Sequence, residues 1–481
     1  MKIGEAFLIT QAKKMNPLRV PNARLATTYI FTTYRVSQMP KIIILLVFFV
    51  FHQLAFATPS STYTGGDSLY LSLPQAWEKA ELHSRLIEIQ RKTTAIALEE
   101  YKDAKAELLF PEIAVKGTAE KASNIPIYEN GLFAKPSQHE VIHTLYHLGA
   151  EFYQVLYHGN KYRLKIKADQ TLHQLSEVQE NKIISDIRYK TASLFLDLQR
   201  CLLFKDLIVQ DIADQEEQLK EIKSFHKNGV VLKSDVLRVE LDLSKRKMAL
   251  VTIDNDILIA NQKLNIILGE PDERRILPTM MAIKKADKFS YQYYLEQALK
   301  HSFSYHISEK QTELSAINLR KVKANVRPQV GIYGEFYYAN PQIFLAPYNP
   351  YWYSLGVIGV KATFPVSAIY HNIHKVNAAK LELEKEEEAH HNTADMVRQE
   401  VKEAYLRYEE ALKQIQVSEV DVKQAEENAR IIKNTYFNQT SLITDLLDAD
   451  IQLLQARFEL AAARILAQNK YYLLQNVIGI L

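Results

Sequence analysis

Acidic side chains near two matched turns are the residues of this sequence whose types and spacing best fit a chemical role. Two segments align at an offset of 210 residues, which pairs Asp235 with Asp445. If several chains met around an axis, these carboxylates would line a narrow opening, attract cations and resist full ionisation. Alternatively, Asp235 and Asp445 only favour the positive ends of two helices that have Ser234 and Thr444 as N-caps.

Three histidines raise the question of metal chemistry. His139, His143 and His147 recur every four residues, a spacing that on a helix would place metal ligands on one face. They precede or enter a strand-like run, however, and in a strand each step of four spans ~13 Å, too far to share one ion. The sequence also lacks a nucleophile elbow, a phosphate loop and a cysteine–histidine zinc spacing. We therefore expect no metal site, no cofactor and no enzymatic activity.

The elements that position the aspartates come from a tandem duplication. An internal repeat of this length must be recognised first, because it determines the fold. Residues 110–117 match residues 327–334 at an offset of 217, with Pro111 on Pro328, and the later matches share the offset of 210. We expect a leader in residues 1–57 and two repeats, 58–270 and 271–481. The matched pairs at the offset of 210 include Arg188 and Arg398, Phe195 and Tyr405, Leu237 and Leu447, Leu264 and Leu474, and Gly269 and Gly479.

Each repeat reads as helix, two strands, helix, turn and helix. In the first repeat a helix over residues 72–109 ends before Pro111, because a helix rarely continues into a proline. Two strand-like runs precede a helix over residues 160–227, and a turn at Asn228 and Gly229 leads to a helix over residues 234–268.

The lengths of these helices predict how they pack. Residues 160–227 would extend roughly 100 Å at about 1.5 Å per residue. The two shorter helices together have nearly the same length, so each repeat is expected to form one continuous rod beside two stacked pieces. Such rods must bury an apolar stripe against neighbours, which favours a cylinder of long helical hairpins.

The strand-like runs alternate in polarity. His147, Glu151 and Tyr153 alternate with an apolar series, and in the second repeat Tyr353, Lys361 and Thr363 do the same. Alternation over ~10 residues is typical of transmembrane β-barrels, with the charges facing the lumen. Four strands per chain cannot close a barrel, whereas three chains would supply twelve, so we expect a homotrimer. The apolar series are Leu148, Ala150, Phe152 and Leu156, and Trp352, Ile358, Val360, Ala362 and Phe364.

Targeting and composition limit the location and the partners. Met39 begins a stretch with a positive start, an apolar core and a small-residue site after Ala57, which predicts a signal peptide and suggests that Met39 is the true start. Net charge is only +3, so no nucleic-acid partner is expected. The single cysteine, Cys201, lies in an apolar run and is expected to pack in a core.

This plan resembles the TolC-like outer-membrane channel-tunnels of Gram-negative bacteria. The resemblance covers nearly all of residues 58–481 and rests on the duplicated plan, on Pro111 and Pro328, and on residues 444–479. It implies a mainly α homotrimer with a twelve-stranded β-barrel in the outer membrane and an α-helical tunnel in the periplasm. It also implies passive export of cargo from an inner-membrane transporter, as in tripartite efflux or type I secretion, through a periplasmic adaptor protein.

The resemblance also implies roles for residues at the two turns. It identifies Asp445 and Asp448 as constriction residues, and Asp235 and Tyr436 as links that hold the closed state. The turns themselves, at Asn228 and Gly229 and at Asn438 and Gln439, would contact the adaptor. Two positions depart from the family pattern. Gln439 stands where glycine is usual, and Ser441 stands where some members have an arginine.

A periplasmic coiled-coil adaptor or scaffold without a barrel is the alternative. Long paired helices would fit it equally well. The alternating strands and the aromatic residues of 337–354, which would suit a membrane interface, favour the channel.

Overall fold

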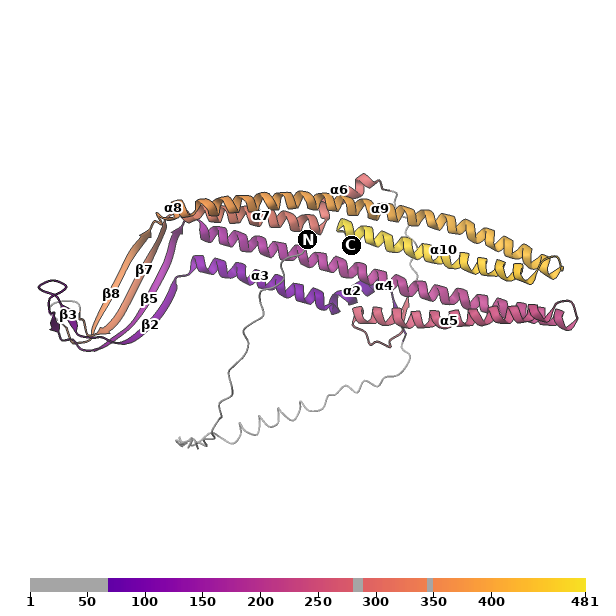
Figure 1. Cartoon of the computed structure of the whole chain (residues 1–481), viewed down its shortest axis with the longest axis horizontal. Coiled ribbons are helices and arrows are strands. Elements are labelled where there is room, and N and C mark those ends of the chain that lie inside the picture. Colours follow the sequence, from indigo (N-terminus) through magenta and orange to yellow (C-terminus); the bar gives the residue numbers. More distant parts are fainter. Residues whose placement is uncertain (1–67, 280–288, 344–348) are drawn as a thin grey trace, which may run out of the picture. The chain divides into compact units, whose positions relative to one another are not determined.

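The computed structural model describes residues 68–279, 289–343 and 349–481. The described residues belong to one compact unit, Gly66–Leu481. The predicted signal peptide, with its start at Met39 and its cleavage site after Ala57, lies outside the described residues. The unit is mostly helical, with a few strands (Figure 1).

Similar helices and strands occur in two successive sets, which we call the first and the second repeat. The helix expected over residues 160–227 is α4 (Lys161–Lys227), and its counterpart in the second repeat is α9 (Ile373–Phe437). The remaining elements of the first repeat are β1 (Leu69–Leu71), α2 (Leu73–His83), α3 (Arg85–Leu109), β2 (Glu112–Lys121), β3 (Ile125–Ile127), β4 (Ser137–His139), β5 (Thr144–His158) and α5 (Lys233–Leu268). Those of the second are β6 (Ile276–Pro278), α6 (Tyr291–His301), α7 (Phe303–Lys323), η1 (Ala324–Val326), β7 (Gln329–Asn340), β8 (Tyr353–Thr363), α8 (Ala368–His371) and α10 (Ile443–Ile478).

The long helices each run beside shorter helices laid end to end. In the first repeat α3, α2 and α5 follow one another along α4, and in the second α7, α6 and α10 pack on α9 (Figure 1). The expectation of one rod beside stacked pieces is therefore confirmed. The long helices leave few breaks because they contain neither proline nor glycine.

One expected helix is two. Residues 72–109 do not form a continuous helix, because the chain is extended at Ser84 between α2 and α3. The same break recurs at Ser302 between α6 and α7. A cause lies in the neighbouring helix ends, since the glycines that end α5 and α10 pack directly against these two breaks. Gly269 abuts His83, and Gly479 abuts His301 and Ser302.

Four long strands form one antiparallel sheet in the order β2-β5-β7-β8. The register pairs Ala114 with Glu151, Glu151 with Glu335, and Gly331 with Lys361. Paired residues share a face, so Glu151 and Lys361 lie on the same side of the sheet, as the alternation predicted. In the described residues, β2 and β8 are each paired along one side only.

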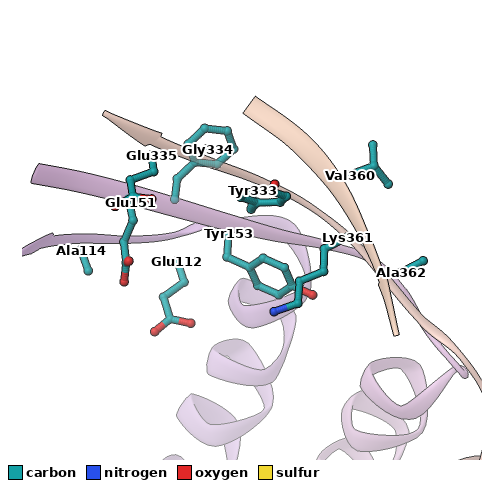
Figure 2. Close-up of a pocket in the computed structure, with 11 residues that line it drawn as sticks. Glu112, Ala114, Glu151, Tyr153, Tyr333, Gly334, Glu335, Val360, Lys361 and Ala362 are labelled. Atoms are coloured by element: carbon teal, nitrogen blue, oxygen red, sulfur yellow. The ribbon is translucent and has the colours of Figure 1, made fainter. Parts of the chain in front are cut away.

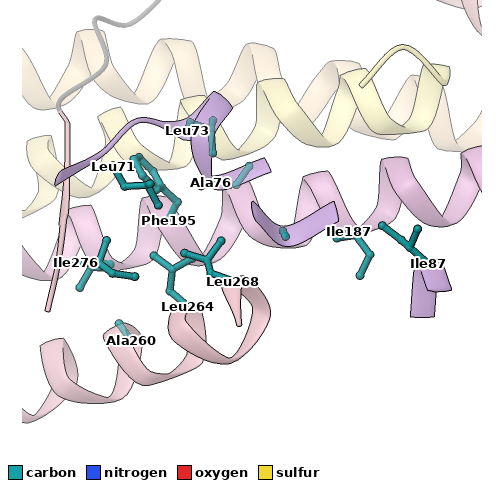
Figure 3. Packing of buried hydrophobic residues seen from close by; sticks show 13 residues of the cluster. Leu71, Leu73, Ala76, Ile87, Ile187, Phe195, Ala260, Leu264, Leu268 and Ile276 are labelled. Carbon is teal, nitrogen blue, oxygen red and sulfur yellow. The ribbon is translucent and has the colours of Figure 1, made fainter. Parts of the chain in front are cut away.

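The first repeat buries its core where helices α2, α4 and α5 meet the small parallel pair β1–β6. Phe195 of α4 packs in one cluster with Leu264 and Leu268 of α5 and with Leu71 and Ile276 of the two short strands (Figure 3). The second repeat has an equivalent cluster around Val401 of α9 and Leu474 of α10. Cys201 is buried on α4, as expected. Among the described helices, none combines the length and apolarity needed to cross a membrane.

Candidate functional site

The two helical hairpins of one chain pack together at their ends. We call the turns at residues 228–232 and 438–442 the hairpin tips. Side chains from α4, α5, α9 and α10 form one apolar cluster next to them, and the rings of Phe225 and Phe437 lie 5.6 Å apart across it. The cluster consists of Leu219, Ile222, Val236, Val239, Leu243, Tyr436, Ile443, Leu446 and Leu447.

The tips share one backbone conformation despite different sequences. Gly229 has φ of 75° and Gln439 has φ of 61°, so both adopt the left-handed region. The N–H of Gly229 donates to His226 at 3.0 Å, and that of Gln439 donates to Tyr436 at 2.8 Å. The four predicted tip residues, Asn228, Gly229, Asn438 and Gln439, are all exposed. A glycine adopts this conformation freely, whereas Gln439 does so at a cost.

The helices after the tips begin one residue earlier than expected. Leu232 and Leu442 hold the N-cap positions, so the prediction that Ser234 and Thr444 are the N-caps is wrong. The Asp445 carboxylate instead accepts the N–H of Leu442 at 3.1 Å. This bond satisfies a donor that the helix start would otherwise leave free. Asp445 therefore supports the start of α10, as the alternative interpretation held.

The predicted constriction residues point away from the apolar cluster. Asp445 and Asp448 are both exposed on α10, three residues apart on one face of the helix. The structure thus brings the two carboxylates together on an open surface. Their arrangement around an axis shared with other chains stays a prediction.

The predicted links are close but not bonded. Tyr436 is 7% exposed, and burial, together with the charge of Asp235, raises the pKa of its hydroxyl. Among the described residues that hydroxyl has no hydrogen-bond partner. Ser441, at the position of the arginine in some family members, accepts a hydrogen bond from Thr435 at 3.1 Å. Links through Asp235 and Tyr436 stay a prediction.

A buried polar cluster behind the tips was missed from the sequence. Arg246 of α5 is 5% exposed and pairs with Asp211 of α4 and with Asp242, whose carboxylate lies 2.7 Å away. Asp450 of α10 accepts hydrogen bonds from two side chains of α4, Gln215 at 2.9 Å and Gln218 at 3.3 Å. Burial raises the pKa values of Asp211 and Asp450.

A sequence signal for this cluster does exist. Arg246 follows the buried Val239 by seven residues and therefore occupies the inward face of α5. Asp242 precedes it by one helical turn, where it can accept the charge. A lone cation on an apolar stripe requires a buried partner, which predicts a carboxylate on the facing helix.

The sheet carries its charges on one face. Glu112, Glu151, Glu335 and Lys361 lie on the side shown in Figure 2, and Glu151 pairs with Lys116. The opposite face is apolar, with Ile113, Ala150, Phe152, Phe336 and Ile358. The predicted alternation is therefore confirmed. It produces a sheet with one polar and one apolar surface.

The three regularly spaced histidines lie in different elements. His139 is in β4, His143 in the following loop and His147 in β5. The His143 ring lies 2.9 Å from the carbonyl oxygen of Ala122, whereas His147 lies 3.8 Å from a carboxylate oxygen of Glu335. His147 lies in a strand, as expected. The β3–β4 hairpin, which contains His139, was not predicted from the sequence.

Comparison with known proteins places this fold among outer-membrane channels. Residues 294–479 match the family model described as "Outer membrane efflux protein". The comparison with curated proteins found no match. Among solved structures, the outer membrane protein VceC from Vibrio cholerae has a TM-score of 0.70 at 16% identity, covering 85% of this chain and 96% of that one.

Two further structures agree with this placement. The outer-membrane channel OprN has a TM-score of 0.69 at 15% identity, with 85% of this chain and 89% of that chain covered. The CmeC outer membrane channel of Campylobacter jejuni has 0.67 at 14% identity, with 85% of each chain covered. The predicted resemblance to the TolC-like outer-membrane efflux proteins is confirmed. The family match covers residues 294–479, and the likeness to these solved structures shows that the chain has their fold.

Proposed function

We propose that three copies of this chain form an outer-membrane channel-tunnel that conducts cargo passively. The observation that carries the proposal is the four-stranded sheet, with one charged and one apolar face and two edges unpaired in the described residues. Open edges are not tolerated in lipid, and a third of a twelve-stranded barrel would need neighbours at both of them. The apolar face would contact the outer-membrane lipid.

The helices would extend the channel into the periplasm. Helices of the first repeat expose apolar side chains, which include Leu237, Leu241 and Leu258 on α5 and Leu86 and Ile89 on α3. Neighbouring copies would cover these side chains and so complete the cylinder. The energy for transport would come from an inner-membrane transporter, reached through a periplasmic adaptor that contacts the exposed tips. Tripartite efflux and type I secretion would both use such a path.

Asp445 and Asp448 would form the constriction at the closed end. Three copies would place six exposed carboxylates around the axis, which attracts cations and slows anions. Contact with the adaptor would open the channel by moving α5 and α10 away from the positions that they hold in the closed state.

The first test is the state and conductance of the protein from outer membranes. The mass of the purified chain in detergent, corrected for bound detergent by light scattering, should equal that of a trimer. Planar bilayers should then show a small current that favours cations. A water-soluble monomer or dimer without current would contradict the channel and support the adaptor or scaffold instead.

The second test concerns the position of the constriction. Asp445→Asn with Asp448→Asn keeps side-chain size and an oxygen at each position while it removes six charges per trimer. We expect larger anion permeation in this variant. Asp395→Asn, an exposed carboxylate of α9 far from the tips, is the control and should leave selectivity unchanged. Unaltered selectivity in the double variant would place the constriction elsewhere.

A further inference from the structure

The second repeat leaves the sheet earlier than the first. β8 ends at Thr363, whereas its counterpart β5 continues to His158, the position that matches Ala368 at the offset of 210. The residues released from the sheet form a turn and α8, which lies where the sheet meets the long helices (Figure 1). This segment has no equivalent in the first repeat, where β5 passes into α4 through Gly159 and Asn160 alone.

The segment around α8 exposes a stripe of apolar side chains. Its helical hydrogen bonds include that of the His371 N–H, which donates to the carbonyl oxygen of Ser367 at 3.1 Å. Positions i, i+3, i+4 and i+7 of this segment are apolar, and each of these residues is more than half exposed. They are Val366, Ile369, Tyr370 and Ile373. Because they follow the exposed Ile358, Val360 and Phe364, the apolar surface of the sheet continues into the helical segment.

Asn372 fixes this stripe against the end of α7. It is buried, and its side chain donates to the carbonyl oxygen of Val322 at 2.8 Å and accepts a hydrogen bond from Asn325 at 3.0 Å. These bonds hold α8 at the level of the last turn of α7 and of η1. The stripe therefore keeps a fixed position beside the side chains at the end of α7.

The end of α7 and the start of α9 carry positive charge that this stretch of the chain leaves unbalanced. Between Glu313 and Glu382 the sequence contains one carboxylate, Glu335, which lies on the polar face of the sheet. On the helices and the turn before β7, six basic side chains of this stretch are exposed, and within the described part of the chain none of them forms an ion pair. They are Arg320, Lys321, Lys323, Arg327, Lys375 and Lys380. Burial lowers the pKa of Lys161 on α4, and the charge of Lys321 lowers it further, so these cations also act on the first repeat.

We propose that α8 and these six cations dock on the surface of a phospholipid bilayer with anionic headgroups. The apolar stripe would enter the boundary between headgroups and acyl chains, while the long basic side chains would reach the phosphates. A neighbouring copy fits this surface less well, because it would pair with the edge of β8, whereas the stripe continues the face of the sheet. A second copy would also bring the same positive charges. This inference rests on the proposed function, since the barrel would place α8 at the periplasmic leaflet of the outer membrane.

The test places a fluorescent reporter in the stripe. Tyr370→Trp puts an indole where an exposed aromatic ring already lies, and the full chain is reconstituted in phospholipid vesicles. Quenching by brominated phosphatidylglycerol is compared with quenching by brominated phosphatidylcholine at the same mole fraction, after subtraction of the signal from Trp77 and Trp352 in the parent chain. Both lipids should quench the reporter. The association constant should be at least about threefold higher for phosphatidylglycerol, because several cations face the headgroups.

Removal of the cations separates their role from that of the stripe. Arg320→Gln, Lys321→Gln and Lys323→Gln are combined in one triple variant, which should abolish the preference for phosphatidylglycerol and retain the quenching by both lipids.

A matched control loses the same amount of charge elsewhere. It combines Lys245→Gln, Lys413→Gln and Lys423→Gln, three exposed lysines of α5 and α9 that also lack an ion pair within the described part of the chain. The control should keep the preference of the parent chain.

Each outcome decides the docking. A chain that conducts while neither lipid quenches the reporter would overturn it and assign the stripe to a neighbouring copy. Equal association constants for the two lipids, or a preference lost in the control as well, would overturn the role of the cations. If the chain neither inserts nor conducts, the proposed function fails, and sedimentation of the soluble chain with phosphatidylglycerol vesicles then decides. Binding that the triple variant loses would support the docking, and no binding would overturn it.

Discussion

Three glycines with nearly the same backbone conformation allow the close packing at the helix breaks to be measured. Gly229, Gly269 and Gly479 have φ of 75°, 70° and 81°. A Cβ at Gly229 would meet nothing within 4 Å, whereas at Gly269 it would lie 2.5 Å from ring atoms of His83. At Gly479 it would overlap the carbonyl oxygen of His301 and lie 2.8 Å from the carbonyl carbon. An added Cβ would therefore meet open space at Gly229, a side chain that can move at Gly269, and backbone that cannot move freely at Gly479.

The expected costs of alanine follow from these neighbours. The left-handed conformation costs alanine about 1 kcal/mol at each position. Gly229→Ala should cost only that amount. Overlap with backbone adds about 1–3 kcal/mol, because α10 must separate from the break between α6 and α7, so Gly479→Ala should cost about 2–4 kcal/mol. Gly269→Ala should fall between them, since the His83 ring can rotate away.

The Tm of each purified variant, measured from the loss of the helical circular dichroism signal on heating, tests these three costs. For 481 residues, an unfolding entropy of roughly 2.1 cal/mol/K per residue makes 1 kcal/mol equal to about 1 °C in Tm. The expected decreases are about 1 °C for Gly229→Ala and about 2–4 °C for Gly479→Ala. If Gly229→Ala lowers Tm as much as Gly479→Ala, the packing of the glycine against the break does not matter, and the explanation of the break at Ser302 is wrong.

Three further predictions concern the tips and the buried cluster. Arg246→Met should destabilise the protein by about 3–5 kcal/mol, because it leaves buried carboxylates unpaired; Arg464→Met, which breaks an exposed pair, should cost at most ~1 kcal/mol in the same thermal assay. Gln439→Gly should slow hydrogen exchange over residues 438–442 about threefold by relieving the positive φ, whereas Asn438→Gly, at φ of −87°, should not slow it. The pKa of Asp450 is raised in the folded state, so the folded state binds this proton more tightly than the unfolded state does. Protection of residues 443–456 from hydrogen exchange should therefore be greatest below pH 3.8, the pKa in the unfolded state, and should fall as the pH rises through the folded pKa. Asp450→Asn should remove that dependence, and a protection that increases with pH would contradict the sign.

The repetitive parts of the fold were predictable, because they follow from local pattern. The helix expected over residues 160–227 differs from α4 by one residue, and the proline at 111 ends α3 as expected. The break at Ser84 was not predictable, since serine is tolerated inside helices and the break depends on contact with Gly269, far along the chain. The β1–β6 pair is likewise invisible locally, because three-residue strands have no measurable period.

The candidate site was predictable only on its exposed side. The resemblance identified Asp445 and Asp448, and both lie exposed on α10. Asp450 lies only two residues further, yet it faces α4, and its role depends on glutamines contributed by another helix. A two-residue step rotates the side chain by about 200°, so neighbours in sequence serve opposite surfaces.

The edges of β2 and β8 that have no partner strand within the described part of the chain determine how defective copies behave. In the proposed trimer each chain would join its neighbours through one edge on either side, so a copy damaged in β8 would still bind a partner through β2. In the proposed trimer a single damaged copy would leave the ring unclosed and would withdraw two sound copies from use. If half of the chains were damaged, only about one ring in eight would contain none of them. Mutations confined to one edge strand should therefore be dominant over the normal gene product, whereas mutations that prevent the whole chain from folding should be recessive.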